Sequence, residues 1–71
     1  MSRPNILMKL GQKIRDLRME KNITQAELAS KCGFEKGSMS RIESGQRNMS
    51  TMTLLRISEA LDVHIKEFFE D

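Results

Sequence analysis

The stretch TQAELASKCGFEKGSMSRIESG, from Thr24 to Gly45, restricts the possible folds of this chain more than any other feature. Thr24 and Glu27 are three residues apart, the spacing at which two side chains cap the first turn of a helix. Gly33 follows where a residue with positive φ would end that helix. The pattern therefore predicts a helix over 25–32. Its apolar face consists of Leu28, Ala29 and Cys32.

A second short helix is predicted directly after the first, over 36–44. Met39 and Ile42 are three residues apart and form its inner face, and Gly45 lies where it would end. Two helices joined by a turn of about three or four residues that contains glycine form a helix-turn-helix. Ala29 suits the point where the helices cross, because a larger side chain would push them apart.

The remaining segments also show helical periodicity, and no convincing strand is present. After a short leader, Ser2 to Asn5, a helix is predicted roughly over 6–20, with an apolar face made of Leu7, Leu10, Ile14 and Leu17. Gly11 inside it is expected to cost about 1 kcal/mol relative to alanine. Ser50 is a suitable N-cap for a helix over 51–61, and a last short helix is predicted over 65–69. The fold class is therefore all-α, with five helices and a single domain, residues 1–71.

Three segments make the expectation more specific: LGQKIRDLRMEKNITQAELASKCGF, SRIESGQRN and LLRISEALDVHIKEFF. From Leu10 to Phe69 the chain resembles the lambda-repressor-like family, also called Cro/C1-type or XRE. The resemblance implies a compact five-helix DNA-binding domain in which 25–32 and 36–44 form the helix-turn-helix. It also implies a sequence-specific regulator of transcription that binds double-stranded DNA.

The polar residues around the second of these helices are the candidate DNA contacts. Side chains on its outer face can hydrogen-bond to base edges in the major groove. The candidate base-reading residues are Glu35, Lys36, Ser38 and Arg41. By the family resemblance, a second group is expected to bind backbone phosphates: Gln25, Gln46, Arg47 and Asn48. The alternative for every residue is an ordinary solvated polar surface.

The resemblance also implies a structural ion pair between Arg18 and Glu43, which sequence spacing alone would not indicate. Two positions depart from the family pattern. Glu35 stands where Ser, Thr or Asp commonly caps the recognition helix, and glutamate is a poorer side-chain cap. Gly37 occupies a position that often carries a base-reading side chain. The operator sequence is therefore not deducible.

Charge is distributed unevenly along the chain, although the net charge is only +2. Residues 1–47 carry ten Lys or Arg and five Asp or Glu, whereas residues 48–71 carry two and five. A basic first part and an acidic last part suggest that one side faces a polyanion. The alternative is a solvated surface with chance asymmetry.

Composition argues against several other classes of protein. The single cysteine, Cys32, excludes an internal disulfide and is expected to be a buried thiol; His64, the only histidine, is expected at a helix N-cap or on the surface. No catalytic set, metal site, cofactor or small-molecule effector is expected. The chain contains no membrane-spanning stretch and no signal-peptide pattern, so a cytoplasmic protein is expected. The family resemblance implies a bacterial or phage protein.

One helix-turn-helix reads too few base pairs to find a single operator, so a homodimer on a two-fold symmetric site is expected. The expected dimer surface is apolar and consists of Leu55, Ile65, Phe68 and Phe69. The alternative is that both phenylalanines close the core of one protomer.

The segment RIESGQRNMS also resembles restriction–modification controller proteins. An alternative function is an antitoxin-type interaction module that neutralises a partner toxin.

Overall fold

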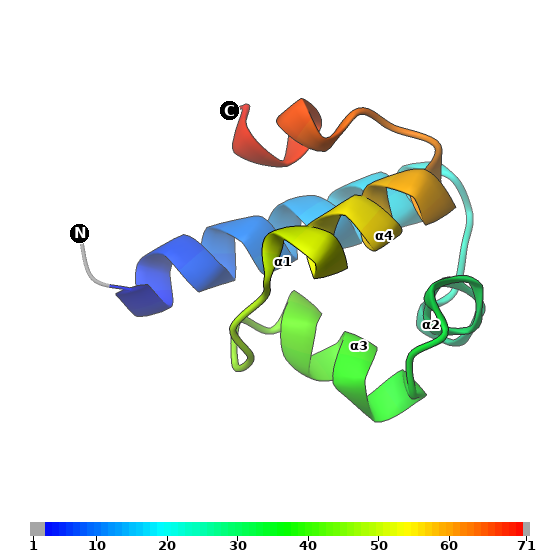
Figure 1. The fold of residues 1–71 in the computed structure, drawn as a ribbon, viewed down its shortest axis with the longest axis horizontal. Helices are drawn as coiled ribbons and strands as arrows, with labels where there is room; N and C mark the ends of the chain where they lie inside the picture. The colour runs from blue at the N-terminus through cyan, green and yellow to red at the C-terminus, as the bar shows by residue number, and fades with distance from the viewer. Residues whose placement is uncertain (1–2, 71) are drawn as a thin grey trace.

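The computed structural model describes residues 3–70, which form four α-helices and one short 3₁₀ helix (Figure 1). No strand occurs in that range. Helix α4 and the 3₁₀ helix η1 pack along α1, while α2 and α3 pack against each other and also contact α4 and α1, respectively. The elements are α1 (Arg3–Glu20), α2 (Gln25–Cys32), α3 (Lys36–Glu43), α4 (Thr51–Leu61) and η1 (Ile65–Phe69).

Helix α1 begins at Arg3, earlier than predicted, so part of the expected leader is helical. Pro4 lies within the first turn of α1. Backbone N–H groups there have no acceptor within the helix, so the absence of an N–H in proline removes no hydrogen bond. Three of the four residues of the expected apolar face lie at the core: Ile14 and Leu17 are buried in it, and Leu10 packs against it. Leu7 is partly buried. Met1 and Ser2 lie outside the described residues.

Helix α2 has the predicted bounds because both predicted end signals are formed. The Thr24 Oγ1 atom accepts a hydrogen bond from the Glu27 N–H at 3.1 Å, and Thr24 N–H donates to Glu27 Oε1 at 3.1 Å. These bonds favour the carboxylate and hold the pKa of Glu27 below its usual range. Gly33 ends the helix at φ +75°, in the left-handed region.

Helix α3 ends at Glu43, one residue earlier than predicted. As expected for a poorer cap, the Glu35 side chain makes no capping hydrogen bond. Helix α4 has the predicted bounds, and Ser50 Oγ accepts from the Thr53 N–H at 3.2 Å.

The prediction of a fifth α-helix is wrong, because Ile65–Phe69 forms a 3₁₀ helix. Five residues provide too few i to i+4 bonds to stabilise an α-helix, and the Glu67 N–H bonds instead to the His64 carbonyl at 3.0 Å. His64 is the N-cap of this 3₁₀ helix, which is one of the two positions expected for it. Its Nδ1 accepts a hydrogen bond from the Lys66 N–H.

The same segment corrects part of the expected dimer surface. Phe68 is only 4% exposed and packs in the protomer core, so the alternative considered for it is correct. Phe69, by contrast, is 63% exposed. Successive residues of a short helix point in different directions, which is why two adjacent phenylalanines have different environments.

Gly11 has a larger role than the sequence suggested. A Cβ atom at this position would lie 2.5 Å from the backbone oxygens of both Ile42 and Glu43. Helix α1 therefore approaches the end of α3 at a point where only a hydrogen atom fits, and glycine is required there.

The core joins all five elements. Cys32 lies within it as a free thiol, its Sγ 3.8 Å from the Arg56 carbonyl oxygen, and burial raises the pKa of Cys32. The buried apolar side chains of the core are Ile14, Leu17, Leu28, Ala29, Cys32, Met39, Ile42, Leu54, Ile57, Leu61 and Phe68.

Among residues 3–70, no helix has the length and apolar character needed to cross a bilayer.

Candidate nucleic-acid interface

A polar hollow runs beside α3 and brings together residues that are distant in the sequence. It contains three of the four predicted base-reading residues and two of the predicted phosphate-binding residues. We call it the α3 hollow. Its lining consists of Gly33, Phe34, Glu35, Ser38, Arg41, Ile42, Arg47, Asn48, Ser50 and Thr53.

Two side chains join the outer face of α3 to the loop that follows it. Arg47 Nη1 donates a hydrogen bond to Ser38 Oγ at 3.0 Å. Because Ser38 accepts this bond, its own hydroxyl proton is available for an acceptor on another molecule. Arg41 is exposed and makes no side-chain hydrogen bond within residues 3–70.

The loop residues on either side of Arg47 are also exposed. Asn48 Oδ1 accepts from the Met49 N–H at 3.2 Å, and the Asn48 amide nitrogen makes no hydrogen bond within residues 3–70. Gln46 is held through its backbone, whose N–H bonds to the Arg41 carbonyl at 2.9 Å. The loop therefore presents three polar side chains from a backbone attached to the end of α3.

Lys36 lies apart from the other predicted base-reading residues. It precedes Ser38 by two positions, which puts the two side chains on roughly opposite sides of α3. Lys36 lines a separate hollow, which we call the α2 hollow. Its lining consists of Arg15, Arg18, Thr24, Gln25, Ala26 and Lys36.

A buried carboxylate connects the helices beneath this surface. Glu43, with its side chain 3% exposed, accepts from Arg18 Nε at 2.7 Å and from Arg18 Nη2 at 3.1 Å. The Arg18 and Glu43 side chains therefore lie in the pairing that the resemblance implied. Gln25 Nε2 also donates to Glu43 Oε1 at 3.0 Å, a contact that the sequence did not indicate.

The helix-turn-helix family HTH_3 matches residues 14–68 of the chain. The chain belongs to this family. Within the matched range, α2 and α3 are the two helices of the helix-turn-helix. Family membership confirms the prediction of a DNA-binding transcriptional regulator in the Cro/C1-type class.

Relatives within the helix-turn-helix family include restriction–modification proteins. The chain is 39% identical to the control protein C.BamHI of Bacillus amyloliquefaciens, with 93% of the chain matching 83% of that protein. It is 34% identical to the control protein C.MunI of a Mycoplasma species, with coverage of 94% and 92%. The crystal structure of the restriction–modification controller protein C.AhdI from Aeromonas hydrophila superposes with a TM-score of 0.86 at 38% identity, covering 89% and 96%.

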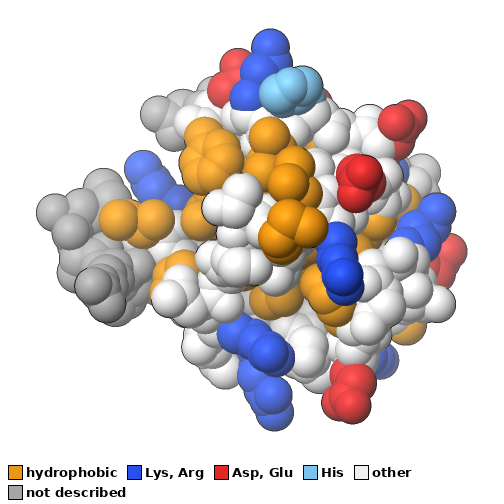
Figure 2. Space-filling model, in the orientation of Figure 1, with side chains coloured by type: hydrophobic (Ala, Val, Ile, Leu, Met, Phe, Trp, Pro, Cys, Tyr) orange, Lys and Arg blue, Asp and Glu red, His pale blue; other side chains and the backbone are white. Residues whose placement is uncertain are grey.

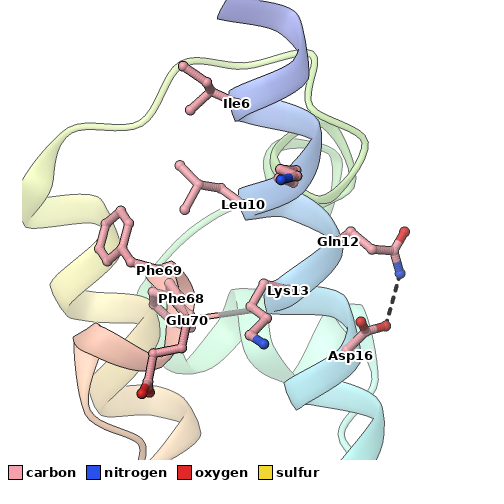
Figure 3. A pocket seen from close by; sticks show the side chains of 9 residues that line it. Ile6, Leu10, Gln12, Lys13, Asp16, Phe68, Phe69 and Glu70 are labelled. Carbon is pink, nitrogen blue, oxygen red and sulfur yellow. Dashed lines mark hydrogen bonds between the residues drawn. The ribbon is translucent and has the colours of Figure 1, made fainter. Parts of the chain in front are cut away.

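The expected dimer residues lie away from the helix-turn-helix, on α4 and η1. Leu55 is partly exposed and Ile65 half-buried, whereas Phe69 projects from the surface and Phe68 does not. Phe69 also borders a hollow between α1 and η1, into which Ile6 and Leu10 point from α1 (Figure 3). Charged side chains of both signs, including Lys13 and Glu70, line the same hollow.

The sequence pattern did not indicate one member of the candidate interface: Arg15, on α1, lines the α2 hollow beside Lys36. Among residues 3–70, no group of three or more His, Cys, Asp or Glu side chains is arranged to hold a metal ion.

Proposed function

We propose that the protein binds a specific double-stranded DNA operator by inserting α3 into the major groove. Residues 1–71 act as one Cro/C1-type helix-turn-helix domain in this proposal. The α3 hollow is the observation that carries it, because it combines a recognition helix with the polar loop that follows. A helix fits a major groove about 12 Å wide, and flanking polar groups fix its position on the phosphates.

Each base-reading role follows from the chemistry of the side chain. Arg41 projects from the outer side of α3 and is suited to bidentate bonds with guanine O6 and N7. Glu35 is suited to accept from cytosine N4. Ser38, whose oxygen accepts from Arg47, is suited to donate its proton to a base or phosphate oxygen. Gln46 and Asn48 would contact the backbone beside Arg47.

Replacing Arg41 with alanine is expected to weaken binding to the cognate operator by about 1–3 kcal/mol, with a smaller loss on scrambled DNA. Fluorescence anisotropy at fixed salt would measure both affinities. Arg56→Ala is the matched control, because Arg56 is an exposed arginine on α4 that lies outside the α3 hollow. Equal losses on both duplexes would make Arg41 a phosphate contact instead.

Selection from random duplex DNA at about physiological salt tests the function itself. Enrichment of a two-fold symmetric site, with half-sites roughly 34 Å apart, is the expected result. Salt-sensitive binding without any enriched sequence would contradict sequence-specific regulation and would favour the antitoxin-type alternative. The relatives named as control proteins, together with the solved structure titled a restriction–modification controller protein, suggest that the operator controls restriction–modification genes.

A homodimer is part of the proposal, with Leu55, Ile65 and Phe69 at its interface. Support comes from the apolar side chains that gather over α4 and η1 (Figure 2). A second copy related by a two-fold axis would cover the same surface on both protomers. It would also present two α3 helices to successive turns of the same DNA face.

Phe69→Ser is expected to weaken self-association at least tenfold, because it removes the one aromatic ring among the three residues of the proposed interface. Sedimentation equilibrium over a micromolar concentration series would measure the monomer–dimer equilibrium. Met19→Ser is the matched control, since Met19 is similarly exposed, at 56%, but lies at the end of α1. A wild-type protein with the monomer mass at every concentration would contradict the dimer.

A further inference from the structure

Gly37 is the one glycine of the chain that contacts among residues 3–70 do not explain. Gly33 and Gly45 have positive φ, at +75° and +78°, and a Cβ atom at Gly11 would lie 2.5 Å from the backbone of α3. A Cβ atom at Gly37 would have nothing within 4 Å, and Gly37 does not have a positive φ. The folded protein therefore has room for a side chain at this position.

A glycine here also disfavours the helix that contains it. Glycine forms helices less readily than alanine, because it loses more backbone freedom when the chain folds. Helix α3 has only eight residues, with Gly37 second among them, and the Glu35 side chain makes no capping hydrogen bond at the same end. No contact within the described residues offsets the loss.

Gly37 lies on the side of α3 that faces away from the core. The buried residues of the helix are Met39, Ile42 and Glu43. At 3.6 residues per turn, Gly37 lies nearly opposite to them, one turn before Arg41, and both Gly37 and Arg41 are exposed. In the proposed complex this line of the helix faces the base pairs, so the backbone of α3 can come closest to them at Gly37.

We infer that Gly37 is a specificity-determining residue, whose missing side chain lets the α3 backbone lie against a thymine methyl group in the major groove. This inference rests on the proposed DNA binding and deepens it, because it names a base that the operator contains. The methyl group occupies the space that a side chain at Gly37 would fill. The base is thus read by the absence of a side chain, at a position where the family pattern often has one.

The chemistry of the glycine Cα selects thymine among the four bases. Its two hydrogens are no substitute for water as hydrogen-bond partners, so a polar base edge pressed against them would lose bonds without replacement. The C5-methyl group of thymine is the apolar group that base pairs present in the major groove, and it needs no such partner. Contact between this methyl group and the Cα atom removes apolar surface from water, which favours binding.

The first test compares Gly37→Ala with the wild type on the operator obtained by selection and on a scrambled duplex. The added methyl group is expected to weaken operator binding at least about tenfold, similar to a mismatched base pair, with a smaller loss on the scrambled duplex. Ser30→Thr is the matched control, because it adds one methyl group to an exposed residue of α2 and should keep the wild-type affinity. Circular dichroism would verify that both variants are folded.

The second test changes the DNA instead of the protein. Replacing the thymines of the operator one at a time with deoxyuridine removes the methyl group and keeps the base pairing. One such replacement should weaken wild-type binding about fourfold, as expected for the loss of one buried methyl group. The same replacement should leave the affinity of Gly37→Ala unchanged or raise it, because the alanine Cβ atom gains the vacated space. Thymines that other residues contact should show equal losses in both proteins.

The outcomes separate this inference from the proposed function. Wild-type operator affinity in Gly37→Ala would overturn the close approach and leave the proposed function intact. Equal losses on the operator and the scrambled duplex would overturn the role in specificity. If no deoxyuridine replacement acts differently in the two proteins, the assignment to thymine is wrong. A wild-type protein that selects no sequence would remove the proposed function itself.

Discussion

Gly11→Ala is expected to lower the free energy of unfolding by about 3 kcal/mol, the upper end of the usual cost of overpacking. The added methyl would meet the Ile42 and Glu43 oxygens at 2.5 Å, and these are backbone atoms that cannot turn away. Relief requires α1 to move from the end of α3, which disrupts the core around Ile14. For a chain of this size, the loss corresponds to a fall in Tm of roughly 15 °C, measurable by circular dichroism.

Gly37→Ala is the matched control for this substitution. It adds the same methyl group to a helical glycine, but nothing lies within 4 Å of the new Cβ. The intrinsic preference for alanine should leave stability unchanged or raise it by up to about 1 kcal/mol. Equal Tm values for Gly11→Ala and the wild type would mean that α1 and α3 are not in close contact.

Glu43→Gln is expected to lower the free energy of unfolding by about 3 kcal/mol. The change leaves the half-buried Arg18 cation without a counter-charge, and breaking a buried pair typically costs 3–5 kcal/mol. It also alters the acceptor for Gln25 Nε2. Urea unfolding monitored by circular dichroism would give the change in free energy and would detect any change in the slope with denaturant.

Two further variants separate a lost ion pair from a general effect of charge. Glu59→Gln removes a carboxylate from the exposed face of α4 and should change stability by less than about 0.5 kcal/mol. The double variant Arg18→Met with Glu43→Leu removes both charges and should recover much of the loss. An unmoved unfolding midpoint in Glu43→Gln would show that the pair contributes no stability.

The parts of the fold that depend on neighbouring residues were predictable from the sequence. The bounds of α2 follow from Thr24, Glu27 and Gly33, because capping acts within one helical turn. Ser50 similarly locates the start of α4. The 3₁₀ geometry of η1 was not predictable in this way, because five residues with helical spacing fit either kind of helix.

Features that depend on contacts between distant residues were predicted only through the resemblance, or not at all. The pairing of Arg18 with Glu43 joins residues 25 positions apart, and the family pattern supplied it. No pattern indicated that Gly11 lies against the end of α3, because only the packed structure brings them together. The different environments of Phe68 and Phe69 likewise depend on how η1 packs on α1.

Some residues of the candidate interface were likewise predictable from local sequence, whereas others were not. Residue type and helical phase indicated Ser38 and Arg41 on α3, whereas the family resemblance supplied Arg47, and all three line the α3 hollow. Phase alone also indicates that Lys36 lies on the other side of α3. The position of Arg15 beside Lys36 required knowledge of where α1 lies relative to α2, which the spacing within α1 does not contain.

Because Cys32 is the single cysteine of the chain, chemical labelling of its thiol can report unfolding. Cys32 is buried beneath α4 and its raised pKa keeps the thiol protonated, so an alkylating reagent reacts with it only when the core opens. The labelling rate then measures the population of open molecules, one label per chain, under fully native conditions. Binding of DNA to the folded protein lowers the population of open molecules. Operator binding would therefore be measured as slower labelling of Cys32, a buried residue outside the proposed DNA contacts.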